Sequence, residues 1–450
     1  STMSIAHLNG AIAQANTATG KSTLAAGATV FSVSSGATIN SGAEAAFETL
    51  LDNETNGLIT LTDQNLTVDS GSISVANAKL LAATTTGTVT ASIDTTESVD
   101  SLKTLYDTSE TNAYTITITA DAGDATGSTA AEFNAINSAT SVAVNMNNVT
   151  ALAASTLSDV NTLALSINAG QFSNGAGLTT VAISDDTIDA TALATAIDNL
   201  DVINGISSTD MTLASGATIN VDADEVTHML LDETENRLDI VDQNIVVTGN
   251  ISVDDANLLS ETTTGTVTAS IATTESITEL KTLTETNNAY TIVISSSDAT
   301  ATAGDLLAID GKTTVRIDAS EVTAISGSFN QITAVYGYNV DADSYGFTGL
   351  GNENITSTED LTVAAANVFD NLTKGTVTAE IDPTETVDSL VNLTGTNAYT
   401  IKIASEDATG STAAELNTIN TATTVAIDVS AVTALASSSF ADLQTLGTAM

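Results

Sequence analysis

The sequence predicts a repeat solenoid in which each coil of 20–28 residues holds one short β-strand and one short helix. The first observation is the phrase Gly-Thr-Val-Thr-Ala-Ser-Ile at residues 87–93, which returns at 265–271 and, with Glu for Ser, at 375–381. A Thr-Glu segment with apolar residues three apart follows each copy. A second phrase, Asn-Ala-Tyr-Thr-Ile, then begins at Asn112, Asn288 and Asn397. Repetition at this spacing is typical of stacked structural repeats.

The strands are predicted from alternation of apolar residues with Thr, Ser or Ala, which gives each strand one buried and one exposed face. In the repeated phrase at residues 87–93, Val89 and Ile93 would face the core, and Thr88 and Thr90 would face solvent. The inward-facing residues predicted for successive strands of the first long repeat are Val89, Ala91 and Ile93; Tyr114, Ile116 and Ile118; Val142, Val144 and Met146; and Leu163, Leu165 and Ile167.

The segments between strands are predicted to be helices. One short helix is expected over residues 5–15, and Thr96-Glu97 is expected to open another that continues through Val99, Leu102 and Leu105. A Thr before a Glu can cap free backbone N–H groups, and the Glu suits the positive end of the helix dipole. The same reading applies to the copies that begin at Thr274-Glu275 and Thr384-Glu385.

Two further helix starts follow from local chemistry. Pro383, the single proline, is expected near the start of a helix, where its missing N–H costs little. The segments 128–132 and 411–415 both read Ser-Thr-Ala-Ala-Glu, which fits a capping box.

The spacing of the phrases divides the chain into four predicted parts. Residues 1–35 form an N-terminal helix and strand, residues 36–215 a first long repeat, residues 216–356 a second, shortened repeat, and residues 357–450 a partial third repeat. The strand–helix pattern is closest to a β-helix or a leucine-rich-repeat-like βα solenoid, although the fixed Leu/Asn frame of that family is missing. The alternative is a series of tandem β-sandwich domains, which would need about seven strands per hundred residues.

Composition excludes several classes of protein. The 450 residues include 55 Asp and Glu against nine Lys and Arg, a formal charge of −46. Such a surface repels phosphate backbones, so nucleic acid is excluded as a partner. No apolar run approaches the ~20 residues of a membrane helix, so membrane insertion is not expected. With 42 % apolar and 3 % aromatic residues, the core must be built from Val, Ile, Leu and Ala.

Several phrases carry a resemblance to known proteins. They are Ala-Ile-Asp-Gly-Lys-Thr-Thr-Val at 308–315, Gly-Leu-Gly-Asn-Glu-Asn-Ile-Thr at 349–356, Leu-Thr-Val-Ala-Ala-Ala-Asn at 361–367 and Thr-Thr-Val-Ala-Ile-Asp at 423–428. They resemble the repeats of large bacterial cell-surface and surface-layer-like proteins, in particular those of marine cyanobacteria. The resemblance implies an extracellular, repetitive, calcium-associated structural protein. The Gly-Gly-x-Gly-x-Asp calcium repeat of type I-secreted members is missing here.

Acidic turn segments are candidate calcium sites. Ca²⁺ takes six to eight oxygen ligands, which closely spaced carboxylates and backbone carbonyls can supply. Acidic turn residues are also common in turns that bind nothing. The candidate ligands are Asp121, Asp124, Asp222, Asp224, Asp341 and Asp343.

Little in the sequence favours catalysis, and we expect no enzyme. His7 and His228 are the only histidines and lie in different parts of the repeat, so a catalytic His with a base or nucleophile nearby is not indicated. Arg237 and Arg316 are the only arginines, which leaves a polysaccharide-active site little basic material. The absence of Cys excludes disulfides and thiolate chemistry, and is typical of exported bacterial surface proteins.

Four functions are compatible with these patterns. We expect a structural protein of the bacterial cell surface that assembles with copies of itself into a surface layer or filament, because the open ends of a solenoid invite pairing. An adhesin stalk that binds a cell-surface glycan is the first alternative. An ice-binding solenoid is the second, since Thr88-Val-Thr90, Thr115-Ile-Thr117 and Thr266-Val-Thr268 could form Thr rows. A polysaccharide-active enzyme is the third.

Overall fold

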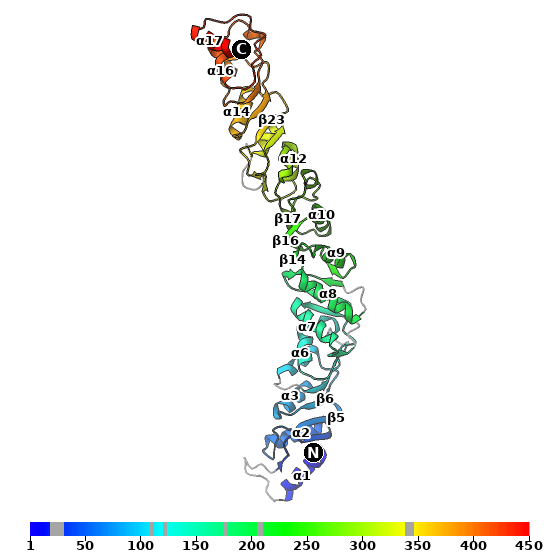
Figure 1. Cartoon of the computed structure of the whole chain (residues 1–450). Coiled ribbons are helices and arrows are strands. Elements are labelled where there is room, and N and C mark those ends of the chain that lie inside the picture. Colours follow the sequence, from blue (N-terminus) through cyan, green and yellow to red (C-terminus); the bar gives the residue numbers. More distant parts are fainter. Residues whose placement is uncertain are drawn as a thin grey trace. The chain divides into compact units, whose positions relative to one another are not determined.

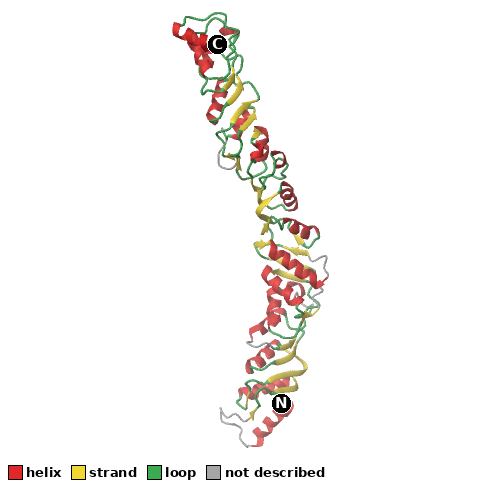
Figure 2. Cartoon of the chain, viewed as in Figure 1, coloured by secondary structure: helices red, strands yellow, loops and turns green. Residues whose placement is uncertain are grey.

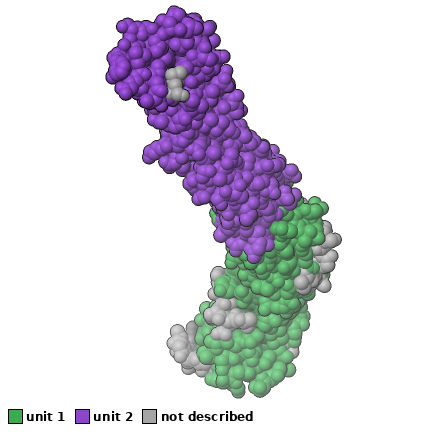
Figure 3. Space-filling model, turned by 45° about the horizontal axis from the view of Figure 1, so that its top comes forward, with its two compact units in different colours: residues 1–219, 227–243 green, residues 220–226, 244–450 purple. Residues whose placement is uncertain are grey.

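The computed structural model describes residues 1–18, 31–107, 112–119, 124–173, 178–204, 210–337 and 346–449. The fold is mixed α/β, with many short parallel strands arranged in sheets, and no closed barrel occurs among these residues. The chain forms two compact units (Figure 3). Unit 1 contains residues 1–219 and 227–243, and unit 2 contains residues 220–226 and 244–450. The division falls within the repeat predicted for residues 216–356.

In unit 1, short strands alternate with helices along the chain (Figures 1 and 2). Its elements are β1 (Thr2–Ser4), α1 (Ile5–Ala18), β2 (Phe31–Ser32), β3 (Thr38–Ala43), α2 (Glu44–Thr55), β4 (Ile59–Thr60), β5 (Asn65–Ile73), α3 (Val75–Thr84), β6 (Val89–Ile93), α4 (Val99–Leu102), η1 (Lys103–Asp107), β7 (Ala113–Thr115), α5 (Asp124–Gly127), α6 (Ala130–Ser138), β8 (Val144–Asn145), β9 (Ala151–Ser155), α7 (Leu157–Asn168), β10 (Phe172–Ser173), β11 (Thr180–Ile183), β12 (Thr187–Asp189), α8 (Ala190–Asn204), β13 (Asp210–Thr212) and β15 (Leu238–Asp239).

The division between the units passes through β14 (Thr218–Asp222) and α9 (Val226–Thr234). Unit 2 continues the same alternation. Its elements are β16 (Asn244–Ile251), α10 (Val253–Thr262), β17 (Val267–Ile271), α11 (Ile277–Leu280), β18 (Ala289–Thr291), η4 (Ser296–Asp298), β19 (Thr300–Thr302), α12 (Ala303–Asp310), β20 (Ile317–Asp318), β21 (Ala324–Gly327), α13 (Phe329–Val335), β22 (Phe347–Thr348), β23 (Asn354–Ser357), α14 (Val363–Leu372), β24 (Val377–Glu380), α15 (Val387–Leu390), β25 (Ala398–Thr400), η5 (Ser405–Asp407), α16 (Ala413–Thr421) and α17 (Phe440–Ala449).

Strands that neighbour each other in a sheet are parallel. In unit 1 the sheets run β1-β3-β5-β6-β7 and β15-β13-β11-β9, with the pairs β2-β4 and β8-β10 beside them. In unit 2, β16, β17 and β18 are neighbours, and a second sheet runs β19-β21-β23-β24-β25. Parallel neighbours require a crossover, which the helices and turns between them supply. Tandem β-sandwiches, the alternative from the sequence, would need antiparallel sheets and do not fit this pairing.

The predicted alternation of strand faces is confirmed in β6. Val89, Ala91 and Ile93 are buried, and Thr90 and Ser92 between them are exposed. The same is true of the next strand phrase, where Tyr114, Ile116 and Ile118 are buried. The apolar face of each strand therefore forms the core between the sheet and its helices.

The prediction of a strand at Leu163, Leu165 and Ile167 is wrong, because these residues lie in helix α7. The Thr156 side chain accepts a hydrogen bond from the backbone N–H of Asp159 and caps the helix. Leu165 is 57 % exposed, whereas Leu163 and Ile167 are buried one turn apart. Three apolar residues at spacing two matched a strand locally, but the longer series at spacings of three and four decides the structure.

The helix starts are confirmed in part. The expected helix over residues 5–15 is α1, and the capping boxes form at Thr129 and Thr412, each with a Glu three residues on. In the Thr-Glu segments, however, the caps are Ser98, Ser276 and Thr386, two residues after the predicted Thr. The predicted roles of Thr96, Thr274 and Thr384 as caps are therefore wrong.

Pro383 lies outside the helix that it was expected to open. The N–H of Glu385 donates to the carbonyl of Asp382 at 3.0 Å, so Pro383 is the second residue of a turn and α15 begins only at Val387. Proline suits this turn position because its φ is already fixed near the required value. Among the described helices, none is both long enough and apolar enough to cross a membrane.

Candidate functional site

Of the candidate calcium ligands, only the pair Asp222 and Asp224 can be examined in full. Asp222 ends β14, Asp224 follows in a turn, and both are exposed. The carbonyl of Asp222 accepts the N–H of Glu225 at 2.9 Å, which closes the turn. Asp124 begins α5, whereas Asp121, Asp341 and Asp343 lie outside the described residues. Within the described ranges no three Asp, Glu or His residues gather closely enough to hold a metal, so calcium binding stays a prediction.

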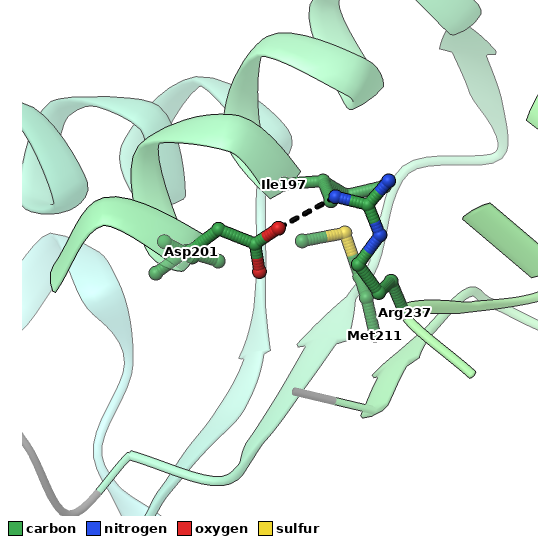
Figure 4. A pocket seen from close by; sticks show the side chains of 5 residues that line it. Ile197, Asp201, Met211 and Arg237 are labelled. Carbon is green, nitrogen blue, oxygen red and sulfur yellow. Dashed lines mark hydrogen bonds and ion pairs between the residues drawn. The ribbon is translucent and has the colours of Figure 1, made fainter. Parts of the chain in front are cut away.

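Arg237 lies at the centre of a charged cluster in unit 1. Its Nη1 is 2.5 Å from Asp201 Oδ2 (Figure 4), its Nη2 is paired with Asp232, and its Nε lies 3.1 Å from Glu235 Oε2. Asp201 comes from α8 and Asp232 from α9, and Arg237 immediately precedes β15. Ile197, Leu200 and Met211 lie beside the ion pairs and leave no room for a water molecule.

The charges of this cluster stabilise the contact between two helices. Burial raises the pKa of Asp232, and the nearby charges of Arg237 and His228 oppose that rise. His228 Nδ1 lies 3.7 Å from Asp232 Oδ2, and the His228 side chain is half exposed. Because carboxylates surround Arg237, its positive charge is already balanced, and the cluster joins α8 to α9 rather than presenting a cation to a ligand.

A hydrogen-bonded framework recurs in each Asn-Ala-Tyr-Thr phrase. In the second copy the buried Asn288 accepts the backbone N–H of Val267 at 2.8 Å, in the strand on one side. The Tyr290 hydroxyl donates to the carbonyl of Ala256 at 3.2 Å, and Thr313 donates to the carbonyl of Tyr290 at 2.7 Å from the other side. The phrase is therefore bonded to both of its neighbours, as buried polar groups require.

The other two copies make the same three bonds. The first uses Asn112 to Val89, Tyr114 to Ala78 and Thr140 to Tyr114, and the third uses Asn397 to Val377, Tyr399 to Ala366 and Thr423 to Tyr399. Sequence reasoning found the phrase and read it as a strand, but missed the framework. The signal for this framework was the recurrence of Asn and Tyr at buried positions. A strand needs neither side chain to form its backbone hydrogen bonds, so their recurrence indicates bonds to neighbouring segments.

Carboxylates cap helices of neighbouring repeats. Glu385 accepts the backbone N–H of Val363, the first residue of α14, at 3.0 Å. The charge thus meets the positive end of a helix more than twenty residues away in the chain. Equivalent bonds join Glu97 to Val75, Glu275 to Val253, Asp298 to Ile277, Asp407 to Val387, Glu359 to Phe329 and Asp185 to Leu157. Glu97 and Glu385 each also accept the hydroxyl of a Ser, Ser101 and Ser389, in the helix that follows them. The prediction that these carboxylates serve the following helix is therefore incomplete, because the backbone N–H groups that they accept belong to the preceding helix.

The Thr rows predicted for an ice-binding face are interrupted. Thr90 lies beside Thr67 on one side but beside Ala113 on the other, and Thr268 lies between Val246 and Ala289. Two adjacent Thr residues do not make a row, so this geometry gives the ice-binding alternative no support.

An apolar face lies at the last repeat of unit 2. Val429, Val432, Leu435 and Leu446 line a hollow of about 290 Å³ between the segment that follows α16 and helix α17. On α17 itself, Phe440 is 82 % exposed and Leu443 is 42 % exposed.

Comparison of the chain with protein-family models, with curated proteins and with solved structures gave no match.

Proposed function

We propose that the chain is a βα repeat solenoid that serves as an extracellular structural protein of a bacterial cell surface and assembles with copies of itself into a filament or surface layer. The observation that carries the proposal is the framework of Asn, Tyr and Thr bonds, made three times with the same partners. Its buried polar groups are used to fix one repeat to the next.

The way in which the repeats complete one another supports the solenoid. A strand of three to five residues with one short helix cannot bury its own apolar edge, so each repeat needs a neighbour on both sides. The caps work in the same way, since Glu385 satisfies a helix of the repeat before it. Stability in such an arrangement increases with the number of neighbouring repeats, so stacking of a second copy would extend the same contacts.

The negative charge and the absence of cysteine support an extracellular location. The charge also makes assembly dependent on salt. A net charge of −46 destabilises a folded chain unless the charge is spread along the molecule or screened. Extracellular salt and divalent cations screen it. Some carboxylates are balanced internally by helix N-termini, but many remain in solvent. Copies therefore repel one another at low ionic strength, and we expect assembly only in salt or with Ca²⁺.

Electron microscopy and light scattering of the purified chain test this proposal. We expect filaments or sheets above a threshold concentration in salt with Ca²⁺, and fewer or none in low salt or after a chelator. A chain that stays monomeric at high concentration in salt, with and without Ca²⁺, would contradict self-assembly. A monomer that instead binds a glycan array would favour the adhesin stalk.

A further inference from the structure

An asparagine recurs at the fifth residue of several helices and bonds to the helix that follows. In α6, Asn134 donates its side-chain N–H to the carbonyl of Asp159, the third residue of α7, at 2.9 Å. The same step from fifth to third residue is made from α1 to α2, from α7 to α8 and from α16 to α17. These bonds run from Asn9 to Ala46 at 2.8 Å, from Asn161 to Ala192 at 3.3 Å and from Asn417 to Asp442 at 2.9 Å. We call each such bond an asparagine rung.

Two further rungs reach the residues that follow the short helices α11 and α15. Asn257, the fifth residue of α10, donates to the carbonyl of Thr282 at 3.1 Å, and its Oδ1 accepts the backbone N–H of Thr284 at 2.7 Å. The fifth residue of α14 makes the same two bonds, from Asn367 to Asn392 at 2.9 Å and from Thr394 to Asn367 at 2.8 Å. Helices with different neighbouring residues thus place the same amide at the same position and use it in the same way.

The single-bond rungs contribute little net stability. The Oδ1 atoms of Asn134, Asn161 and Asn417 are buried, and none of the described residues donates a hydrogen bond to them. A buried acceptor without a protein donor offsets most of what one amide bond contributes. The fifth residue of α12 is Leu307, so the same position also accepts an apolar side chain. The recurrence of Asn therefore needs a reason other than stabilisation.

The apolar contacts between these helices do not by themselves fix one helix along the axis of its neighbour. Helices α6, α7 and α8 follow one another in unit 1 (Figure 1). Ala192 and Asn199 of α8 accept bonds from Asn161 and Asn168 of α7, and Ala196, which lies between them in α8, is fully buried. Small side chains form shallow ridges, so a shift of one turn, about 5.4 Å, would keep apolar atoms in contact but would separate each amide from its carbonyl.

We propose that the asparagine rungs set the axial register of each helix on the next, and that they specify the stack more than they stabilise it. A single Asn at an apolar contact acts in this way in coiled coils, where it fixes register at a cost in stability. A helix in register satisfies the amide donor, whereas a slipped helix leaves that donor buried without an acceptor. The inference concerns stacking within one chain and holds whether or not copies assemble.

The junction between α12 and α13 lacks the chemistry of a rung. Leu307 has no donor to offer the carbonyl of Gln331, the third residue of α13. Register here depends on the packing of apolar side chains, among them the buried Ile309 and Ile332. We therefore expect α13 to slide on α12 more readily than α7 slides on α6.

Methyl NMR of the isoleucine-labelled chain tests the proposal, in low salt, where we expect no assembly. Asn134→Leu keeps the approximate size of the side chain but removes the rung, and the melting temperature should stay within about 2 °C of the parent. The signals of Ile136 on α6 and Ile167 on α7 should split or broaden, because a slipped register becomes about tenfold more favourable relative to the native one. Asn137→Leu is the matched control, since Asn137 bonds to the Gln171 side chain and makes no rung, and its signals should stay single and sharp.

The junction of α12 and α13 gives the converse test. Leu307→Asn supplies an amide at the position of a rung, where it can donate to the carbonyl of Gln331. Exchange between registers should broaden the methyl signals of Ile309 and Ile332 in the parent, and this substitution should sharpen them. Relaxation dispersion measures the exchange. Leu307→Ala, which removes apolar atoms without adding a donor, is the control and should leave the broadening in place.

The methyl signals decide the outcome. Split or broadened signals of Ile136 and Ile167 in Asn134→Leu, with Asn137→Leu unchanged, would support the rungs as the determinant of register. Single sharp signals in Asn134→Leu would overturn the proposal whatever the melting temperature, and so would equal splitting in the control. If Asn134→Leu does not fold, Asn161→Leu repeats the test at the next rung, read at Ile167 and at Ile197 of α8. Exchange at Ile309 and Ile332 that Leu307→Asn leaves unchanged would also overturn it.

Discussion

A buried tyrosine occupies the same position in each of three repeats, and its hydroxyl loses its proton when the pH rises far enough. Tyr114, Tyr290 and Tyr399 are fully buried, and burial raises the pKa of Tyr290 to about 12. The same cause raises the pKa of the other two. Each hydroxyl must stay protonated to donate to its helix carbonyl, so ionisation would remove a bond and bury a charge.

The first prediction concerns this alkaline limit. An unfolded tyrosine ionises near pH 10, whereas Tyr290 in the fold ionises near 12. The contribution of Tyr290 to the free energy of unfolding is therefore complete below pH 10 and is lost as the pH rises from 10 through 12. The loss amounts to about 1.4 kcal/mol for each unit by which the pKa is raised. Tyr290→Phe should lose about 1 kcal/mol at pH 7 with its hydrogen bond and should weaken the alkaline fall in stability.

Denaturant unfolding between pH 7 and 12 measures this effect. Tyr106→Phe is the control, because Tyr106 is 59 % exposed and should leave the curve unchanged. An alkaline fall that is as steep in Tyr290→Phe as in the parent chain would show that the buried hydroxyl does not set the limit.

Among the elements, the helices depend on carboxylates from the neighbouring repeat. At the start of α14 the cap residue Thr362 satisfies one backbone N–H, and Glu385 satisfies another. The capping of α14 by Glu385 could not be predicted from spacing, because Glu385 is closer in sequence to α15. Local rules assign a Glu to the helix that follows it, but the stacking of repeats brings the preceding helix within reach.

The second prediction is that Glu385→Ala destabilises the chain by about 1 kcal/mol, the usual cost of losing a cap. The reason is that the N–H of Val363 would lose its partner in a half-buried place. Thermal unfolding measures the loss, with Glu380→Ala, an exposed residue at the end of β24, as the matched control. Equal effects of the two variants would mean that charge, rather than the cap, determines the result.

Over the whole molecule, the charge of −46 is the dominant electrostatic quantity. Ion pairs are few among the described residues, and examples such as Lys281 with Asp305 at 2.5 Å are partly exposed. Surface pairs of this kind contribute about 0–1 kcal/mol each, so salt removes little by screening them. The repulsion among the many carboxylates is larger than the attraction within these ion pairs, and salt screens that repulsion.

The third prediction follows from that balance. The melting temperature of the chain, measured at a protein concentration too low for assembly, should rise by roughly 2–4 °C or more between low salt and physiological ionic strength. Calorimetry at two concentrations of NaCl measures it, and a protein-concentration series separates the change from residual assembly. A melting temperature that falls with salt would show that ion pairs outweigh the net repulsion.

The sequence by itself determined the alternation of strand and helix, the buried faces of strands such as β6 and the capping boxes at Thr129 and Thr412. These features depend on residues within one strand or one helical turn, where side-chain period and cap chemistry act directly. The tertiary structure alone decided that Glu385 caps α14 and that the Tyr290 hydroxyl of one repeat bonds to the carbonyl of Ala256 in another. Each of these depends on which repeat lies beside which, a relation between residues far apart in the chain that local pattern does not encode.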